Sequence, residues 1–282
     1  MKKVLQKAIS MALIASLATG ILVVGMPAKV NAIGKGLTWE TAEEILTHIS
    51  DPVFPDYKVN INDFGAIPND DKLDTKAITD AIKHVYEIGG GTVIVPKGTY
   101  DTGSIELLSN VNLHLEDEES LLRFTTENNE ENYPLAYSHW EASPVYNYRA
   151  LIYAYEAENI ALTGKGRLDG QASKDVWWNW KHQIEHAWSE DKISLQEVAS
   201  NKLRAMNNDG VPVEERIFGD GGYLRPNFIQ TILCKNVLFE GVTLNNSPMW
   251  QVNPVRSENV TVRGMTLQSH GDNNDGVDPE SC

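Results

Sequence analysis

The sequence contains little cysteine for a chain of 282 residues. Its two cysteines are Cys234 and Cys282, so a disulfide framework does not hold the fold together and a hydrophobic core must do so. Cys234 stands in an apolar, strand-like pattern, which predicts a buried thiol. Cysteine and histidine never cluster with the spacing of metal ligands, and we therefore predict no metal site and no cofactor.

Long apolar runs are also scarce, with one exception at the start of the chain. An uncharged apolar stretch covers residues 8–26, follows three lysines and precedes Val30-Asn31-Ala32. This layout predicts a secretory signal peptide over residues 1–32, cleaved after Ala32. The stretch is also long enough for a membrane anchor, which is the alternative. After cleavage we expect a secreted protein with no membrane association.

Basic residues are few. The chain has 24 lysines and arginines against 39 acidic residues, a net charge of −15. Residues 1–32 hold four lysines and no acid, so the mature chain would carry 20 basic and 39 acidic residues, a net charge of −19. Nucleic acids and anionic membranes require basic surfaces, and we expect neither as a partner.

An internal repeat is the most informative pattern that is present. Residues 236–244 and 259–267 align without gaps at an offset of 23, and residues 159–164 and 110–115 are related to them. Each segment begins with asparagine and alternates apolar with polar residues, as a strand does. Strand-and-turn units that recur in this way indicate a solenoid of parallel strands, whose turn asparagines can hydrogen-bond from one coil to the next. The alternative is an antiparallel β-sandwich.

The remaining segments suggest how this solenoid is organised. A helix is predicted at 74–85, with Asp74 as its N-cap and an apolar face that caps the first coil. Gly89–Gly91 ends the helix, and residues 92–95 begin the first coil. We assign residues 33–60 to an N-terminal extension and residues 61–282 to the β-helix. Residues 171–223, which contain four tryptophans, interrupt the strands as an insert.

Several motifs resemble a known enzyme family. Residues 63–66, 74–78 and 90–100 look like the opening of pectin-degrading β-helix enzymes, and residues 225–227, 246–250 and 273–278 are similar to glycoside hydrolase family 28, the polygalacturonases. The resemblance covers about residues 60–282. It implies an all-β, right-handed parallel β-helix and a glycosidase that cleaves α-linked galacturonic acid in pectin by inverting hydrolysis. Arg225-Pro226 and the tryptophan-rich insert look more like the exo-acting and rhamnogalacturonan-type branches.

The resemblance also supplies candidate site residues. The family has Asn-Thr-Asp-Gly where this chain has Asn273-Asn274-Asp275-Gly276. It implies that Asp275 is a catalytic carboxylate that activates water, and that Asn273 and Asp278 support it or bind substrate. In an extended strand Asp275 would point to one face and Asp278 to the other. A plain Asn-Asp-Gly turn is the alternative.

Other family motifs do not occur before Cys282. These are a Gly-Asp-Asp segment that supplies the general acid, a glycine-flanked histidine and an Arg-x-Lys pair that grips uronate; Arg225, Arg256 and Arg263 do not form that pair. We therefore expect a C-terminally truncated chain. A calcium-dependent pectate lyase and a non-catalytic polysaccharide-binding or adhesin solenoid remain alternatives. In each case the expected partner is a polysaccharide, and the expected state is a monomer.

Overall fold

The computed structural model describes residues 38–181 and 194–282, so the predicted signal peptide lies outside the described residues. The described residues fall into two units, residues 38–48 and residues 49–282. In the first unit the structure describes helix α2 (Trp39–Thr47), whose N-cap Thr38 accepts a hydrogen bond from the backbone of Thr41. Within the described ranges, no helix has the length and apolar character needed to cross a bilayer.

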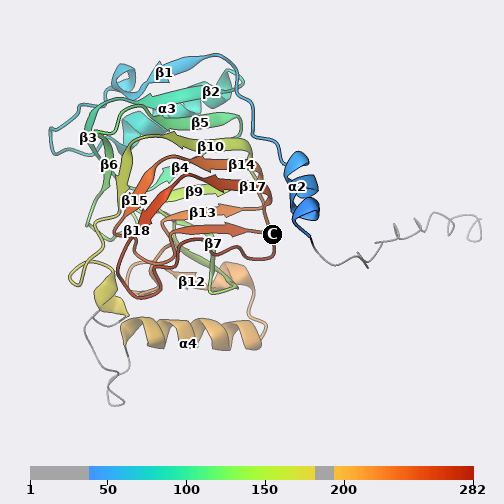
Figure 1. The fold of residues 1–282 in the computed structure, drawn as a ribbon. Coiled ribbons are helices and arrows are strands. Elements are labelled where there is room, and N and C mark those ends of the chain that lie inside the picture. Colours follow the sequence, from blue (N-terminus) through green and yellow to red (C-terminus); the bar gives the residue numbers. More distant parts are fainter. Residues whose placement is uncertain (1–37, 182–193) are drawn as a thin grey trace, which may run out of the picture. The chain divides into compact units, whose positions relative to one another are not determined.

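The second unit is a stack of coils, each contributing strands to three parallel sheets (Figure 1). The first sheet contains β1 (Lys58–Asn60), β2 (Gly91–Val95), β5 (Val111–Leu115), β10 (Glu158–Gly164), β14 (Lys235–Glu240) and β17 (Glu258–Arg263). The second contains β3 (Gly98–Thr102), β6 (Ser120–Phe124), β11 (Arg167–Asp169), β15 (Thr243–Asn245) and β18 (Thr266–Gln268). The third contains β4 (Ile105–Glu106), β9 (Ile152–Tyr155), β13 (Ile229–Ile232) and β16 (Val252–Val255).

Every pair of neighbours within these three sheets is parallel, and the antiparallel β-sandwich is therefore wrong. The 23-residue repeat of the sequence is also the offset between paired residues of neighbouring coils, because Val237 of β14 pairs with Val260 of β17. Apolar side chains that alternate along the strands fill the interior of the coils, and this interior forms one continuous core. The predicted parallel β-helix is confirmed.

The four repeat asparagines form a ladder at one corner of the coils. Asn159 donates to Asn110 at 3.1 Å, Asn236 donates to Asn159 at 3.0 Å, and Asn259 donates to Asn236 at 2.9 Å. All four adopt the left-handed backbone conformation, with φ between 52° and 63°. Asparagine tolerates this conformation better than most residues, and its amide can both donate and accept within the ladder.

The first part of the β-helix agrees in most respects with the prediction made from the sequence. Helix α3 (Thr75–Glu87) follows the short helix η1 (Ile61–Phe64) and packs its apolar face into the core beside β2 and β5. Asp74 occupies the N-cap, but its side chain does not cap the helix. Its Oδ1 instead accepts from the backbone N–H of Ile67 at 3.0 Å. Strand β1 lies in the predicted extension, so the first sheet begins before residue 61.

Two excursions leave the coils. The first, which the sequence did not predict, is an antiparallel hairpin of β7 (Leu135–Trp140) and β8 (Ser143–Tyr148), and β8 also pairs with β12 (Ile217–Phe218). The second is the predicted insert, with η2 (Trp178–Trp180), α4 (Leu195–Asn208) and η3 (Val213–Glu215). Trp177 and Trp178 are buried in the core, and Trp188 lies outside the described residues.

Candidate active site

The segment that carries the candidate carboxylates extends the third sheet beyond β16. The backbone N–H of Gln251 donates to the Asp275 carbonyl oxygen at 2.9 Å, and that of Asp278 donates to Val252 at 2.8 Å. Single parallel bridges join Val252 to Val277 and Val255 to Glu280. The Asn-Asn-Asp-Gly motif therefore begins in a turn at residues 272–273 and leads into a segment that pairs in parallel with β16.

Asp275 and Asp278 occupy different environments on this segment. Asp275 is exposed, whereas Asp278 is partly buried, and its Oδ2 has no hydrogen-bond partner among the described residues. Burial, together with the charges of Asp275 and Glu280, raises the pKa of Asp278 from 3.8 to about 6. In mildly acidic solution, Asp278 therefore holds its proton beside an exposed carboxyl group.

Asp278 ends a row of polar side chains on the outer face of the third sheet. Tyr153, Gln230 and Asn253 lie in register on β9, β13 and β16, and the Val252–Val277 bridge places Asp278 next in the row. Gln230 Nε2 donates to Asn253 Oδ1 at 2.7 Å. The parallel register thus brings together polar groups that are scattered over 126 positions of the sequence.

The β7–β8 hairpin lies against the same face. His139 Nδ1 is 3.1 Å from Glu280 Oε2, and both side chains are largely buried. Gln230 contacts the hairpin twice, because its Nε2 donates to the His139 carbonyl oxygen at 2.9 Å and its Oε1 accepts from Ser138 at 2.7 Å. The hairpin therefore packs against the outer face of the third sheet beside Asp278.

The Asn273 side chain is bound by Arg225. Its backbone is left-handed, with φ 57°, and its Oδ1 accepts from Arg225 Nη2 at 3.2 Å. Arg225 itself is completely buried, so it cannot contact a polysaccharide. The structure thus places Asp275 and Asp278 close enough to interact through their charges, and it places Asn273 at the start of the same segment, bound to Arg225.

Sequence reasoning did not identify the side chains that hold this site. Gln251 donates to the Asn274 carbonyl oxygen at 3.1 Å, and Asn253 donates to the Asp278 carbonyl oxygen at 2.7 Å. Both precede their partners by one coil, at offsets of 23 and 25 residues, so the 23-residue repeat could have linked Gln251 to the motif but not Asn253. Glu280 and His139 have no such signal, because they come from different parts of the chain.

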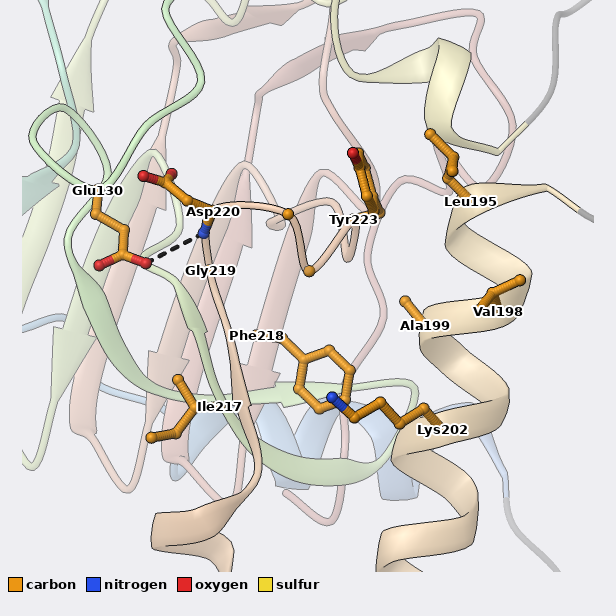
Figure 2. Close-up of a pocket in the computed structure, with 12 residues that line it drawn as sticks. Glu130, Leu195, Val198, Ala199, Lys202, Ile217, Phe218, Gly219, Asp220 and Tyr223 are labelled. Atoms are coloured by element: carbon orange, nitrogen blue, oxygen red, sulfur yellow. Dashed lines mark hydrogen bonds between the residues drawn. The ribbon is translucent and has the colours of Figure 1, made fainter.

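A separate cavity of about 420 Å³ lies between α4 and residues 217–223 (Figure 2). Lys202 stands 5.1 Å from the centre of the Phe218 ring. At another part of the rim, Glu130 accepts from the backbone N–H of Asp220 at 3.1 Å. None of the residues that line this cavity belongs to segment 273–280, so it is distinct from the candidate active site.

The carboxylate pair has the chemistry of acid and base catalysis. An exposed carboxylate can accept a proton from water, and a neighbouring carboxyl group whose pKa is raised to about 6 keeps its proton in more acidic solution than that.

Comparisons with known proteins agree with the fold and with the resemblance. No family model matches the sequence. A probable polygalacturonase from Vitis vinifera is 26% identical over 237 residues, which are 80% of this chain and 40% of the relative. The crystal structure of a hyperthermoactive exopolygalacturonase from Thermotoga maritima is 44% identical with a TM-score of 0.80, and the match covers 87% of this chain and 54% of that one.

A family 28 exopolygalacturonase from Yersinia enterocolitica shares the fold at 24% identity and a TM-score of 0.56, over 79% of this chain and 40% of that one. The chain therefore spans about half the length, or less, of these relatives. Both the resemblance to polygalacturonases and the right-handed parallel β-helix are confirmed.

Proposed function

We propose that the protein is an exported glycoside hydrolase that cleaves α-linked galacturonic acid in pectin. One observation carries the proposal: Asp275 and Asp278 lie together at the edge of the third sheet in a chain that is 44% identical to an exopolygalacturonase. The name of that relative also favours an exo-acting enzyme, which would release single sugars from chain ends.

The proposed reaction is hydrolysis with inversion. Asp275, which is exposed, accepts a proton from the attacking water, and Asp278 holds a proton beside it below about pH 6. The resemblance assigns the general acid to a Gly-Asp-Asp segment that does not occur up to Cys282. That the chain is truncated stays a prediction, and sequencing the coding DNA beyond Cys282 tests it.

Replacing the proposed base tests the function directly. In the full chain, Asp275→Asn should lower the release of reducing ends from polygalacturonate by about 10²–10⁴-fold. Asp56→Asn, at an exposed position outside the site, is the matched control and should leave the rate unchanged. Equal rates for wild type and Asp275→Asn would remove Asp275 from the mechanism.

The products separate the alternative functions. A hydrolase yields saturated sugars without added calcium, whereas a calcium-dependent product with a 4,5-double bond and ultraviolet absorbance would identify a lyase. Binding of polygalacturonate without turnover, unaffected by Asp275→Asn, would favour the adhesin-type alternative. Chromatography of early products distinguishes release of single sugars from internal cleavage.

Export and oligomeric state have their own measurements. A secreted protein whose N-terminus is Ile33, found by mass spectrometry, would support cleavage after Ala32. Sedimentation equilibrium of that mature protein tests whether it is a monomer.

A further inference from the structure

Arg225 is a completely buried cation whose hydrogen bonds all go to neutral oxygens. Its Nε donates to Gln196 Oε1 at 2.6 Å, its Nη1 donates to the carbonyl oxygens of Pro248 and Asp272 at 2.7 and 2.8 Å, and its Nη2 donates to Asn273 Oδ1 at 3.2 Å. Burial lowers its pKa to about 10, so it stays charged at neutral pH. A buried charge is costly unless each of its donors is satisfied, which fixes these acceptors in place.

The acceptors come from three separate parts of the chain. Gln196 is on α4 of the insert, Pro248 is in the bend before β16, and Asp272 and Asn273 lead directly into Asp275. One side chain therefore ties the insert to the loop that carries the proposed base. Asn273, which accepts from Arg225, has a left-handed backbone with φ 57°, a conformation that few residues adopt.

The Asn274 side chain also holds this loop in place, through a second set of hydrogen bonds. Its Oδ1 accepts from Ser269 Oγ and from the backbone N–H of Gly271, both at 2.6 Å. Its Nδ2 donates to the carbonyl oxygens of Ser247 and Met249 at 3.1 and 2.9 Å. These bonds join the loop to the neighbouring coil but not to α4, so the link to the insert depends on other residues.

The insert reaches the loop at a second point. Trp178 Nε1 donates to the Ser247 carbonyl oxygen at 2.9 Å, and its ring lies where a Cβ on Gly271 would stand. Trp178 thus supports the loop through packing, whereas Gln196 supports it through Arg225. The insert contacts the catalytic loop from two directions.

We propose that Arg225, oriented by Gln196, is a positioning residue that fixes the loop at residues 271–274 and so aims Asp275 at the attacking water. This inference rests on the proposed function for its catalytic consequence, but not for its structural one. The insert then acts on catalysis through a buried hydrogen-bond chain that runs from Gln196 through Arg225 to Asn273.

The experiment compares Gln196→Leu with Gln196→Glu in the full chain. Leucine removes the acceptor for Arg225, whereas glutamate restores an acceptor oxygen, and Ala205→Ser on the exposed side of α4 is the control. We expect Gln196→Leu to speed amide hydrogen exchange in residues 271–276. We also expect it to lower kcat on oligogalacturonate by about 10–100-fold with KM changed less than threefold, since small misplacements of a reacting group have such effects. Gln196→Glu and Ala205→Ser should match wild type in both the rate of amide exchange and kcat.

The two readouts separate this inference from the proposed function. Faster exchange in Gln196→Leu, in a protein that does not hydrolyse pectin, would support the positioning role and reject the function. Unchanged exchange and kcat in Gln196→Leu, while Asp275→Asn is inactive, would reject the positioning role and keep the function. If Gln196→Leu does not fold, Asn273→Gly removes the last contact of the chain while allowing the left-handed backbone, and it should produce the same exchange and the same loss of kcat; wild-type behaviour would overturn the proposal.

Discussion

Asn253 lies in register with Asp278 and donates its side-chain amide to the Asp278 carbonyl oxygen at 2.7 Å. The same amide donates to Glu280 Oε1 at 3.1 Å, and its Oδ1 accepts from Asn227 at 2.8 Å and from Gln230 at 2.7 Å. Asn253 is completely buried, and it uses both amide hydrogens and its oxygen. One side chain therefore anchors the backbone of the candidate active site.

Replacing Asn253 with leucine should destabilise the fold. The change leaves Asn227, Gln230 and the Asp278 carbonyl oxygen without this partner, and one buried polar group without a bond costs about 1–3 kcal/mol. Urea denaturation should show a free energy of unfolding lowered by at least that amount. Asn201→Leu, at an exposed position of α4, is the control. A loss no larger than that of the control would mean that the row of polar groups adds no stability.

Asp278 should make stability depend on pH in a defined direction. Its pKa is about 6 in the folded protein and near 3.8 in the unfolded chain. Below pH 3.8 both states hold the proton, and the group has no effect. Between these values the unfolded chain loses its proton first, so folding becomes less favourable as pH rises, and the penalty is complete above pH 6.

Asp278→Asn removes this ionisation. The free energy of unfolding of Asp278→Asn minus that of wild type should therefore increase from pH 4 to pH 7, measured by urea denaturation at each pH. Asp56→Asn should show a constant difference over this range. A difference for Asp278→Asn that did not vary with pH would contradict the raised pKa.

The asparagine ladder predicts different effects for two substitutions of Asn159. Glycine keeps the left-handed backbone but loses the bonds to Asn110 and Asn236, worth about 0.5–1.5 kcal/mol each. Alanine loses the same bonds and also strains the backbone, at about 1–2 kcal/mol. Asn159→Ala should therefore unfold at lower urea concentration than Asn159→Gly. The opposite order would show that the backbone conformation is not what selects asparagine.

The two cysteines should differ in reactivity. Cys234 is completely buried, which raises the pKa of its thiol to about 11, whereas Cys282 is exposed. Iodoacetamide at pH 8 should therefore alkylate Cys282 in the native protein and Cys234 only after unfolding in urea. Peptide mass spectrometry reports each site separately. Early modification of Cys234 would indicate local opening of β13 or β14.

The sequence predicts the coils well because their determinants are local. Val237 and Val260 stand at equivalent positions of two similar segments, and the strand alternation that buries them is visible in the sequence. The hairpin β7–β8 was missed because its two-residue loop, Glu141-Ala142, has a positive φ at both positions without asparagine or glycine. Such a turn lacks the usual sequence signature, and the packing around it must stabilise it.

The site was predicted in part for a similar reason. Asp275 and Asp278 were identified from a short motif, and their expected orientation toward different faces of a strand stays a prediction. The contact of Glu280 with His139 joins residues 141 positions apart, and Arg225 acts through a buried chain that includes the insert. Contacts of this kind depend on where the hairpin and the insert pack against the coils. Neither the composition nor the periodicity of the sequence predicts those positions.

Along the asparagine ladder, the steps from Asn110 through Asn159 and Asn236 to Asn259 are 49, 77 and 23 residues. Each coil of the ladder therefore contributes one asparagine, whatever the number of residues between one ladder position and the next. Because the entropy of closing a loop grows only with the logarithm of its length, a coil can acquire a long loop without shifting those above and below it. The long excursions after β6 and β11 thus leave the register of the coils above and below them unchanged.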